Sequence, residues 1–386
     1  MKYLNKLLCI CSLLGCFFTS CEDWTELETK EIDKVGGHNT SSSEEYYASL
    51  RAWKETYKDY GRPVSFGWFS NWSPEGAFRK GYLESLPDSI DMISMWSGPF
   101  DLTPAKIRDK EIFQKKKGGK LFVCYILHNI GTGITPSFVA EKVQAEHPDA
   151  DSKEMTELIK KAQEEYWGFT SGKKGSADHT AAIQRYARAL VDTIKATGYD
   201  GLDIDWEPDN AGDGDGSLKN KWTEDGEFAT DPGRYLHVLV EELGKYLGPK
   251  ANQTGNDKYY YLLVDGEIKN VDKKSAPYFD YIISQAYSNA WTLDERIEEI
   301  KNIFGEYYDV RKHIFTENFE SYWHNGGDIM KHAAFNSKYG PKGGVGAFRL
   351  DNDYDNVPDY KYMRQAIQVN LKAYQDYINN QTNSGK

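Results

Sequence analysis

The feature that most constrains the fold is an alternation of short apolar runs and helical patterns after residue 60. Runs rich in β-branched and aromatic residues are typical of strands. Eight strands alternating with helices predict a (β/α)8 TIM barrel, because right-handed crossovers close such units into one. A doubly wound open sheet is the alternative. The runs are VSFGWF (64–69), SIDMISM (89–95), KLFVCYIL (120–127), YDGLDIDW (199–206), KYYYLLVD (258–265), FDYIISQAY (279–287), HIFTENF (313–319) and GGVGAFRL (343–350).

Several helices between these runs have recognisable ends. Thr103 followed by Pro104 pairs an N-cap residue with proline at the first helical position. Thr292 and Glu295 have the spacing of a capping box. The helix before the fourth strand is predicted to end at Gly198. In either barrel or open sheet, ligands bind at the carboxyl ends of the strands.

The N-terminus is typical of an export signal. Residues 1–20 place Lys2 and Lys6 ahead of an apolar run that is too short to span a bilayer, which predicts a cleaved signal peptide. The ending FTSC resembles a bacterial lipobox, in which Cys21 becomes the lipidated first residue. An ordinary leader with an incidental cysteine is the alternative. The acidic pair after Cys21 resembles the signal that sends lipoproteins to the cell surface. We therefore expect an exported lipoprotein, at the cell surface of the outer membrane or facing the periplasm.

The mature chain is predicted to contain one folded domain. Residues 21–43 form a polar, lipid-anchored tether with a Gly-Gly pair and a serine run, and residues 44–386 form the barrel. Of the five cysteines, three lie in the leader, Cys21 is the anchor and only Cys124 remains. An intradomain disulfide is therefore excluded, and stability depends on a hydrophobic core.

The charge and composition restrict the partners. The chain carries 47 basic residues (Lys and Arg) against 59 acidic residues, a net charge of −12, and loss of the leader removes two lysines to give 45 − 59 = −14. Such a surface disfavours nucleic acid and attachment to a membrane other than through the lipid anchor. Aromatic residues make up 14% of the chain, and their faces suit the apolar faces of sugar rings. We expect a monomer.

The fourth run, YDGLDIDWEPDN (199–210), concentrates four acidic residues. Because side chains alternate along a strand, Asp203, Asp205 and Glu207 share one face, and the apolar residues between them share the other. The three acids are predicted to point into the barrel, with Glu207 outermost at its mouth. Asp200 has the opposite parity and is expected to be a structural turn or cap residue.

Three interpretations of this acidic row compete. A solvated edge strand is hard to reconcile with the apolar strands and helices on both sides of it in sequence. A metal site would need carboxylates from several directions, and the sequence lacks an HExxH motif or a His-rich partner. The third interpretation is acid catalysis, because crowded carboxyls cannot all ionise and at least one pKa must rise. A protonated carboxyl is what a departing glycosidic oxygen needs. We therefore expect neither a metal ion nor a cofactor.

The segment D200-G-L-D203-I-D205-W-E207 resembles the DGxDxDxE signature of glycoside hydrolase family 18, which contains chitinases and endo-β-N-acetylglucosaminidases. The signature is complete and lies on the fourth strand, as in that family. The resemblance implies that Glu207 protonates the glycosidic oxygen and that the substrate's own acetamido oxygen attacks the anomeric carbon. It also implies that Asp205 holds the acetamido N–H and that Asp203 shares a proton with Asp205.

Two further segments indicate a branch of the family. Where many members have Met-x-Tyr on the sixth strand, this chain has Gln285-Ala286-Tyr287, a form that resembles the endoglycosidases. The Tyr287 hydroxyl would bind the acetamido oxygen, although a tyrosine that ends a strand is also common as plain core. Chitinases typically place tryptophan under the reacting sugar, at the position of Phe348. The short connection 320–342 leaves no room for the extra domain of many chitinases.

Further substrate-binding candidates are Trp72, Trp96 and Tyr125, each of which is also compatible with ordinary packing. The connections 129–178 and 208–230 are predicted as the long loops that set specificity. Together these features predict an endo-β-N-acetylglucosaminidase that cleaves the chitobiose core of N-glycans. The alternatives are a chitinase and a glycan-binding lipoprotein on a catalytically silent barrel.

Overall fold

The computed structural model describes residues 43–96, 99–208, 216–221, 227–251 and 258–384. The predicted signal peptide, the lipidation site Cys21 and the tether to residue 42 lie outside these residues. Parts of the predicted loop 208–230 do so as well. Within the described residues, no helix is both long enough and apolar enough to cross a membrane.

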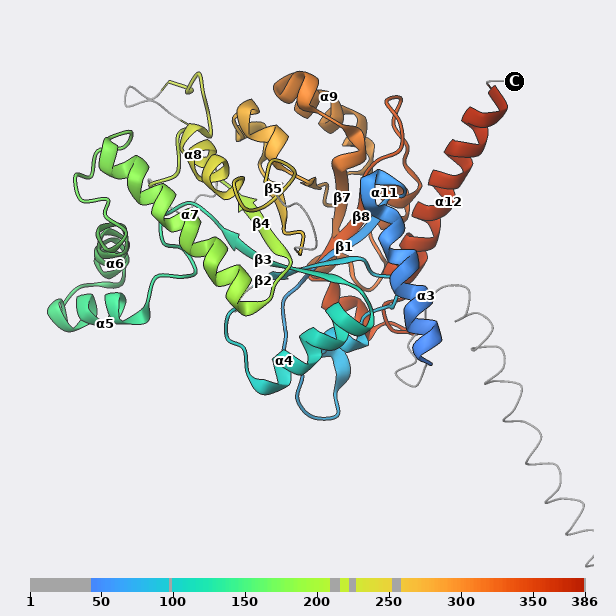
Figure 1. Ribbon diagram of the computed structural model, residues 1–386, viewed down its shortest axis with the longest axis horizontal. Coiled ribbons are helices and arrows are strands. Elements are labelled where there is room, and N and C mark those ends of the chain that lie inside the picture. Colours follow the sequence, from blue (N-terminus) through green and yellow to red (C-terminus); the bar gives the residue numbers. More distant parts are fainter. Residues whose placement is uncertain (1–42, 97–98, 209–215, 222–226, 252–257, 385–386) are drawn as a thin grey trace, which may run out of the picture.

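Eight parallel strands pair in sequence order and form a closed barrel (Figure 1). The first strand pairs with the last, Val64 opposite Gly344, so the predicted TIM barrel is confirmed and the open sheet is excluded. Each strand overlaps its predicted run. The strands are β1 (Val64–Phe69), β2 (Met92–Trp96), β3 (Lys120–Ile126), β4 (Gly201–Trp206), β5 (Tyr261–Gly266), β6 (Tyr281–Gln285), β7 (His313–Asn318) and β8 (Gly344–Phe348).

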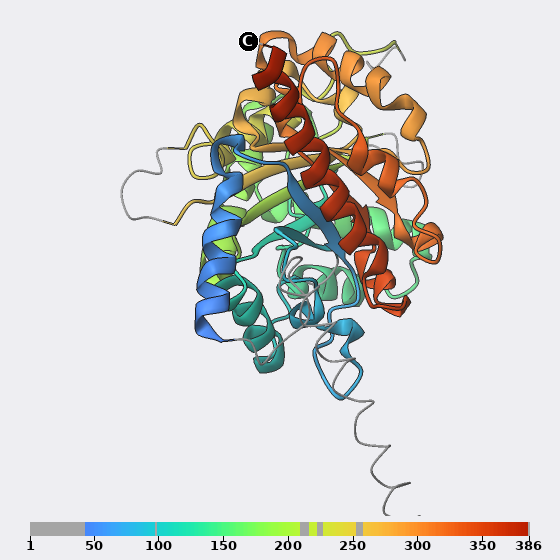
Figure 2. The same cartoon turned by 90° about the vertical axis from the view of Figure 1, so that its right-hand side faces the viewer.

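The helices surround the barrel, and Figure 2 shows the first described helix (blue) and the last one (red) both on its outside. The last helix is tied to the start of β1 by the Tyr374 hydroxyl, which donates to the Gly61 carbonyl at 2.7 Å. The α-helices among the described residues are α3 (Glu44–Lys54), α4 (Pro104–Glu111), α5 (Ser137–Glu146), α6 (Ser152–Tyr166), α7 (Ala177–Thr197), α8 (Arg234–Leu243), α9 (Leu293–Phe304), α10 (Phe319–Tyr322), α11 (Ile329–Ala334) and α12 (Lys361–Ser384).

The local signals at helix ends hold in two cases of three. The Thr103 side chain accepts from Lys106 N at the start of α4, and Gly198 ends α7 with a φ of 73°. Thr292 is the N-cap residue of α9, but its hydroxyl donates to the Asn289 carbonyl, so the predicted capping box is not formed. The connection 129–178 is predicted as a loop, and the structure shows that it contains α5 and α6, which pack against each other (Figure 1).

Two layers of core follow from strand parity. Side chains that point outward pack against the helices, among them Leu202 and Ile204 of β4. Side chains that point inward form a second cluster, which includes Phe66, Leu263 and Ile283. The inner cluster fills the barrel below its carboxyl end. Polar groups at that end therefore lie on a solid apolar base.

Candidate active site

Strand β4 points the predicted acids into the barrel. Asp203 and Asp205 are buried, and Glu207 follows the strand at its mouth with partial exposure. Asp200 lies at the other end of β4, where its Oδ2 accepts from Leu121 N at 2.8 Å and its Oδ1 pairs with the Lys258 ammonium at 2.9 Å. The row of three and the structural role of Asp200 are placed as the alternation predicts.

Two strands that do not pair with β4 supply hydrogen-bond donors to Asp203. Its Oδ2 accepts from the indole N–H of Trp68 on β1 at 3.0 Å and from the Ser94 hydroxyl on β2 at 2.6 Å. Burial raises the pKa of Asp203 to about 6, against the opposing effect of these donors. The pKa of Asp203 is thus shifted towards neutral pH from that of an ordinary aspartate. The sequence reasoning named neither Trp68 nor Ser94.

A fourth carboxyl group, which the sequence analysis did not predict, belongs to the acidic site. Asp265 of β5 lies directly opposite Asp205 in the strand register and is 1% exposed. Burial raises the pKa of Asp265 well above its usual value, and the charges of Asp205 and Asp203 raise it further. The pKa of Asp205 is also well above its usual range, through burial and then through the charges of Glu207 and Asp203. Burial and mutual repulsion thus favour the protonated forms in this buried cluster.

Gln285 connects this cluster to the residue at the mouth. Its side-chain amide donates to Glu207 Oε1 at 3.2 Å and to Asp265 Oδ1 at 2.9 Å. Both amide hydrogens can therefore be used on carboxyl oxygens, one deep in the barrel and one at its mouth. The predicted substrate-binding residue Gln285 lies within the acidic site.

Tyr287 lies just beyond Gln285 and faces the same carboxyls. Burial raises the pKa of the Tyr287 hydroxyl well above its usual value, and Asp265, Asp205 and Glu207 add to the effect. The hydroxyl consequently stays protonated and is a hydrogen-bond donor for an incoming oxygen. The Tyr287 ring lies against Phe348, with centroids 6.2 Å apart and planes inclined by 29°.

Phe348 is the centre of an aromatic group beside the acids. Trp68 meets it edge-on at 6.2 Å, and Trp96 of β2 does so at 6.0 Å. Phe348 and Trp96 are both partly exposed at the carboxyl ends of their strands. The structure therefore brings these two predicted substrate-binding rings together with Tyr287.

The structure does not bring the other two predicted rings, Trp72 and Tyr125, to the acidic row. The Trp72 indole N–H donates to Asp109 Oδ2 of α4 at 2.8 Å, and the side chain is 7% exposed in the outer core. Tyr125 has the opposite parity to Cys124, which faces inward, so its ring packs outward near Phe100 at 6.0 Å. Nearness to a strand end does not determine the direction of a side chain: Trp72 lies beyond the end of β1, and Tyr125 lies on the outward face of β3.

The connection after β6 is fixed by a buried carboxylate. Glu317 of β7 accepts from Ser288 N at 2.9 Å through Oε1 and from Asp328 N at 2.6 Å through Oε2. Gly327 has a φ of 51°, and a Cβ there would lie 2.6 Å from Glu317 Oε2, so glycine permits this close approach. The backbone that follows Tyr287 is thereby held in place.

One group among the described residues has the spacing of a metal site. Cys124, Asp203 and Asp265 each place a ligand atom within 4.8 Å of the other two. Burial, together with these carboxyls, raises the pKa of the Cys124 thiol well above its usual value, which opposes the thiolate that a metal needs. Asp203 Oδ2 already accepts two hydrogen bonds. The donor set suits shared protons better than an ion.

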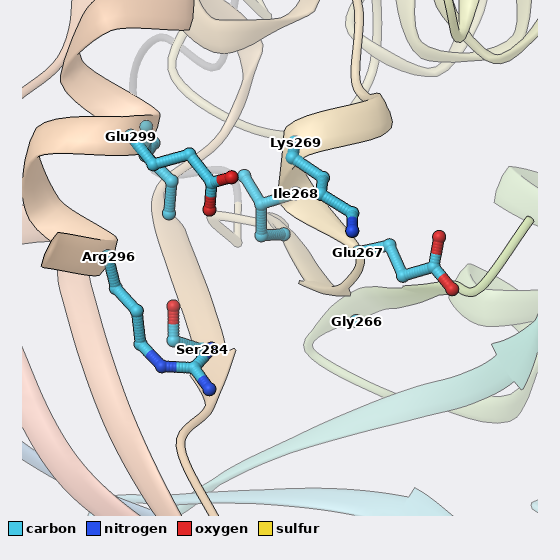
Figure 3. A pocket seen from close by; sticks show the side chains of 8 residues that line it. Gly266, Glu267, Ile268, Lys269, Ser284, Arg296 and Glu299 are labelled. Carbon is cyan, nitrogen blue, oxygen red and sulfur yellow. The ribbon is translucent and has the colours of Figure 1, made fainter. Parts of the chain in front are cut away.

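A cavity of about 210 Å³ lies near this site but outside the acidic row (Figure 3). Ser284 faces it, whereas the adjacent Gln285 faces the acids, so the two spaces lie on opposite faces of β6. Helix α9 forms its other wall. The lining residues are Gly266, Glu267, Ile268, Lys269, Ser284, Arg296, Glu299 and Ile300.

Comparisons with known proteins agree with this geometry. The sequence profile of glycoside hydrolase family 18, BT1044-like, matches residues 25–369. A solved structure of a glutamate-to-glutamine variant of BT1044, in selenomethionine form, has 26% identity and a TM-score of 0.65, over 87% of this chain and 95% of that one. The apo endo-β-N-acetylglucosaminidase of Cordyceps militaris has the same fold, with 17% identity and a TM-score of 0.54, over 87% of this chain and 98% of that one. A comparison with curated sequences found no match.

A closed barrel with an inward row of acids at the end of its fourth strand is compatible with a glycoside hydrolase, in which carboxyl groups act on the glycosidic bond. Since the family profile spans most of the chain, the chain belongs to glycoside hydrolase family 18, BT1044-like. The family predicted from the DGxDxDxE segment is thereby confirmed.

Proposed function

We propose that the protein is an endo-β-N-acetylglucosaminidase that hydrolyses the chitobiose core of N-glycans. The observation that carries the proposal is the placement of Gln285 and Tyr287, the residues of the endoglycosidase-like segment. Gln285 bonds to Glu207, and Tyr287 faces the carboxyls of Asp205 and Asp265. A protonated donor and an acidic pair thus surround the place where a 2-acetamido group would sit.

The chemistry needs no enzyme nucleophile. Glu207 gives its proton to the glycosidic oxygen, the bond from that oxygen to the anomeric carbon breaks, and the acetamido oxygen bonds to the same carbon. Asp205 accepts from the acetamido N–H and balances the positive charge of the oxazolinium-like ring. The hydroxyl of Tyr287 donates to the acetamido oxygen and orients it. Water then opens the ring with net retention, and Glu207 takes up the water proton.

The test is Glu207→Gln, which keeps the acceptor for the Gln285 amide but supplies no proton. We expect release of glycan from a glycoprotein to fall by about 10²–10⁴-fold, since that is the usual contribution of a general acid, while sugar binding persists. Released glycan is measured by mass with high-mannose glycoprotein, complex-type glycoprotein and chitooligosaccharide as substrates. Glu299→Gln on α9 is the control, because that residue lines the cavity outside the barrel.

Each outcome separates the candidate functions. Wild-type release from a glycoprotein supports the proposal, and cleavage of chitooligosaccharide alone supports a chitinase. Sugar binding with no cleavage of any substrate supports the silent barrel. A Glu207→Gln variant with wild-type activity would overturn the mechanism.

We also propose that the mature protein is an outer-membrane lipoprotein anchored through Cys21. The support is the short apolar leader that ends in FTSC and the polar segment that follows. Mass spectrometry of the N-terminal peptide from the membrane fraction tests it. A peptide that starts at Cys21 with attached acyl chains supports the proposal, and an unmodified mature N-terminus overturns it.

A further inference from the structure

We propose that Asp265 is a positioning residue, which holds the proton of the buried acidic cluster and, through Gln285, fixes the orientation of Glu207. The inference rests on the proposed function, because it concerns the same site. It assigns a role to a residue outside the DGxDxDxE segment, on the neighbouring strand.

The strand register places Asp265 where it can do this. It pairs with Asp205 across β4 and β5, and with Ile283 across β5 and β6. Gln285 lies two residues beyond Ile283, so it occupies the next inward position towards the mouth. Asp265 is therefore beneath Gln285 and beside Asp205.

Within the part of the chain that the structure describes, three buried carboxyl oxygens of the acidic cluster lack a hydrogen-bond donor, so they need a proton of their own. Asp203 Oδ1, Asp205 Oδ1 and Asp265 Oδ2 are buried and, among the described residues, have no separate hydrogen-bond donor. Carboxyl oxygens that face one another are satisfied only when a proton lies between them. Asp265 Oδ1 is occupied by the Gln285 amide, so Oδ2 is the oxygen that can carry the proton.

The charged surroundings favour Asp265 as the holder of that proton. The groups that face it are Asp205 and Asp203 from β4, Cys124 from β3, and Gln285 and Tyr287 from β6 and its end. None of them carries a positive charge that would stabilise an Asp265 carboxylate. Asp203, in contrast, accepts hydrogen bonds from the Trp68 indole and the Ser94 hydroxyl.

A protonated Asp265 has two effects on the reaction. Its hydroxyl donates to Asp205 Oδ1, which keeps Asp205 anionic and leaves the other oxygen for the acetamido N–H. Its carbonyl oxygen accepts one hydrogen of the Gln285 amide, so the second hydrogen remains directed at Glu207 Oε1. Loss of the Asp265 acceptor would free the amide to rotate away from Glu207.

Two substitutions separate the proton from the carboxylate. Asp265→Asn places an N–H where the proposal puts the O–H and keeps the acceptor for Gln285, whereas Asp265→Leu removes both. We expect kcat to fall by less than about tenfold in Asp265→Asn and by more than about a hundredfold in Asp265→Leu, from the lost proton-transfer geometry. The alkaline limb of the kcat/KM pH profile moves to higher pH in Asp265→Asn, because its donor cannot ionise.

The control is Asp280→Asn, a buried aspartate that accepts from the Tyr259 hydroxyl and from Leu262 N, away from the acids. It leaves the pH profile of kcat/KM in place. Equal losses in Asp265→Asn and Asp265→Leu, or an unmoved profile in Asp265→Asn, would overturn the inference. A stoichiometric metal ion in the purified protein would also overturn it, since Asp265 would then be a ligand.

A titration without substrate keeps the inference distinct from the proposed function. Carbon-13 NMR of the aspartate carboxyls follows Asp205 in the wild type and in Asp265→Asn. We expect the Asp205 signal to show a second shift at alkaline pH in the wild type, where Asp265 loses its proton, and no such shift in the variant, because an amide does not ionise. If the wild type cleaves no glycan and this shift is present, only the proposed function fails. If glycan is released and the shift is absent, only the inference fails.

Discussion

The two ends of the barrel interior bury aspartates in opposite ways. At the amino end, Asp91 precedes β2 and is 1% exposed, like Asp265 at the carboxyl end. The Arg62 guanidinium donates to both oxygens of Asp91, at 2.8 and 2.9 Å, and Ser65 adds a backbone and a hydroxyl donor. Among the described residues, no cation lies beside Asp265, which receives one amide hydrogen bond from Gln285.

The difference shows that burial alone does not decide the role of a carboxyl. A cation and several donors satisfy both oxygens of Asp91 inside the protein, and the resulting buried pair lies beside the amino ends of β1 and β2. At the carboxyl end, where the described residues supply no such cation, burial raises the pKa of the three aspartates and favours their protonated forms. The first arrangement stabilises structure, and the second keeps protons available where a substrate would bind.

The largest expected effect comes from breaking the charged pair. Asp91→Leu leaves the Arg62 guanidinium buried without its partner, and we expect a loss of about 3–5 kcal/mol in the free energy of unfolding. Urea denaturation followed by tryptophan fluorescence measures it. The double variant Arg62→Met with Asp91→Leu should recover much of the loss, because no uncompensated charge remains. A single-variant loss below about 1 kcal/mol would contradict this view of the amino end.

At the carboxyl end we expect the variant Asp203→Asn to be more stable than the wild type at neutral pH, because the substitution removes a charge that burial disfavours. The pKa of Asp203 is raised from 3.8 to about 6, so its contribution to stability is fully present below pH 3.8 and is lost as the pH rises through 6. A shift of this size corresponds to on the order of 3 kcal/mol as an upper limit, because neighbouring carboxyls share the proton. Activity falls, since Asp203 belongs to the acidic row.

The check is urea denaturation of both proteins between pH 4 and pH 8. Asn keeps an acceptor for Trp68 and Ser94, so the comparison isolates the ionisation. The variant should gain stability relative to the wild type as the pH rises through this interval. A difference that stays constant with pH would show that Asp203 is already charged in the fold at pH 4.

The sequence was sufficient to predict the barrel and the acidic residues that β4 contributes to the site. The alternation of apolar runs located all eight strands, and parity along β4 placed Asp203, Asp205 and Glu207 correctly relative to one another. Loop 129–178 was predicted from its length, and length does not distinguish an irregular loop from one that contains helices. Helix α6 has no fully buried residue, but its apolar residues do recur on one face, so the signal for this helix was present in the sequence.

Asp265 escaped prediction for a different reason. Asp265 ends the run KYYYLLVD and lies two residues after Leu263, whose side chain points into the barrel. This spacing was the one feature of the sequence that could have predicted an inward-pointing Asp265. The distance between Asp265 and Asp205 depends on the register between β4 and β5, which spacing along one strand does not give. Tyr125 points outward because its neighbour Cys124 occupies the inward face of β3, and the position of a residue near a strand end does not distinguish the two faces.

The smallest expected effect concerns a single donor to the acidic cluster. Trp68→Phe keeps an aromatic ring beside Phe348 but removes the N–H that donates to Asp203 Oδ2 at 3.0 Å. We expect a loss of about 1–2 kcal/mol in the free energy of unfolding and a higher pKa for Asp203, because a donor that favours its charged form is gone. Trp206→Phe is the matched control, since that indole donates to the Asn270 carbonyl at 3.0 Å on the outer face of β4. It should cost a similar amount of stability without moving the pH dependence of catalysis. Equal pH profiles for the two variants would mean that the Trp68 donor does not set the ionisation of Asp203, and that burial alone controls the carboxyl end of the barrel.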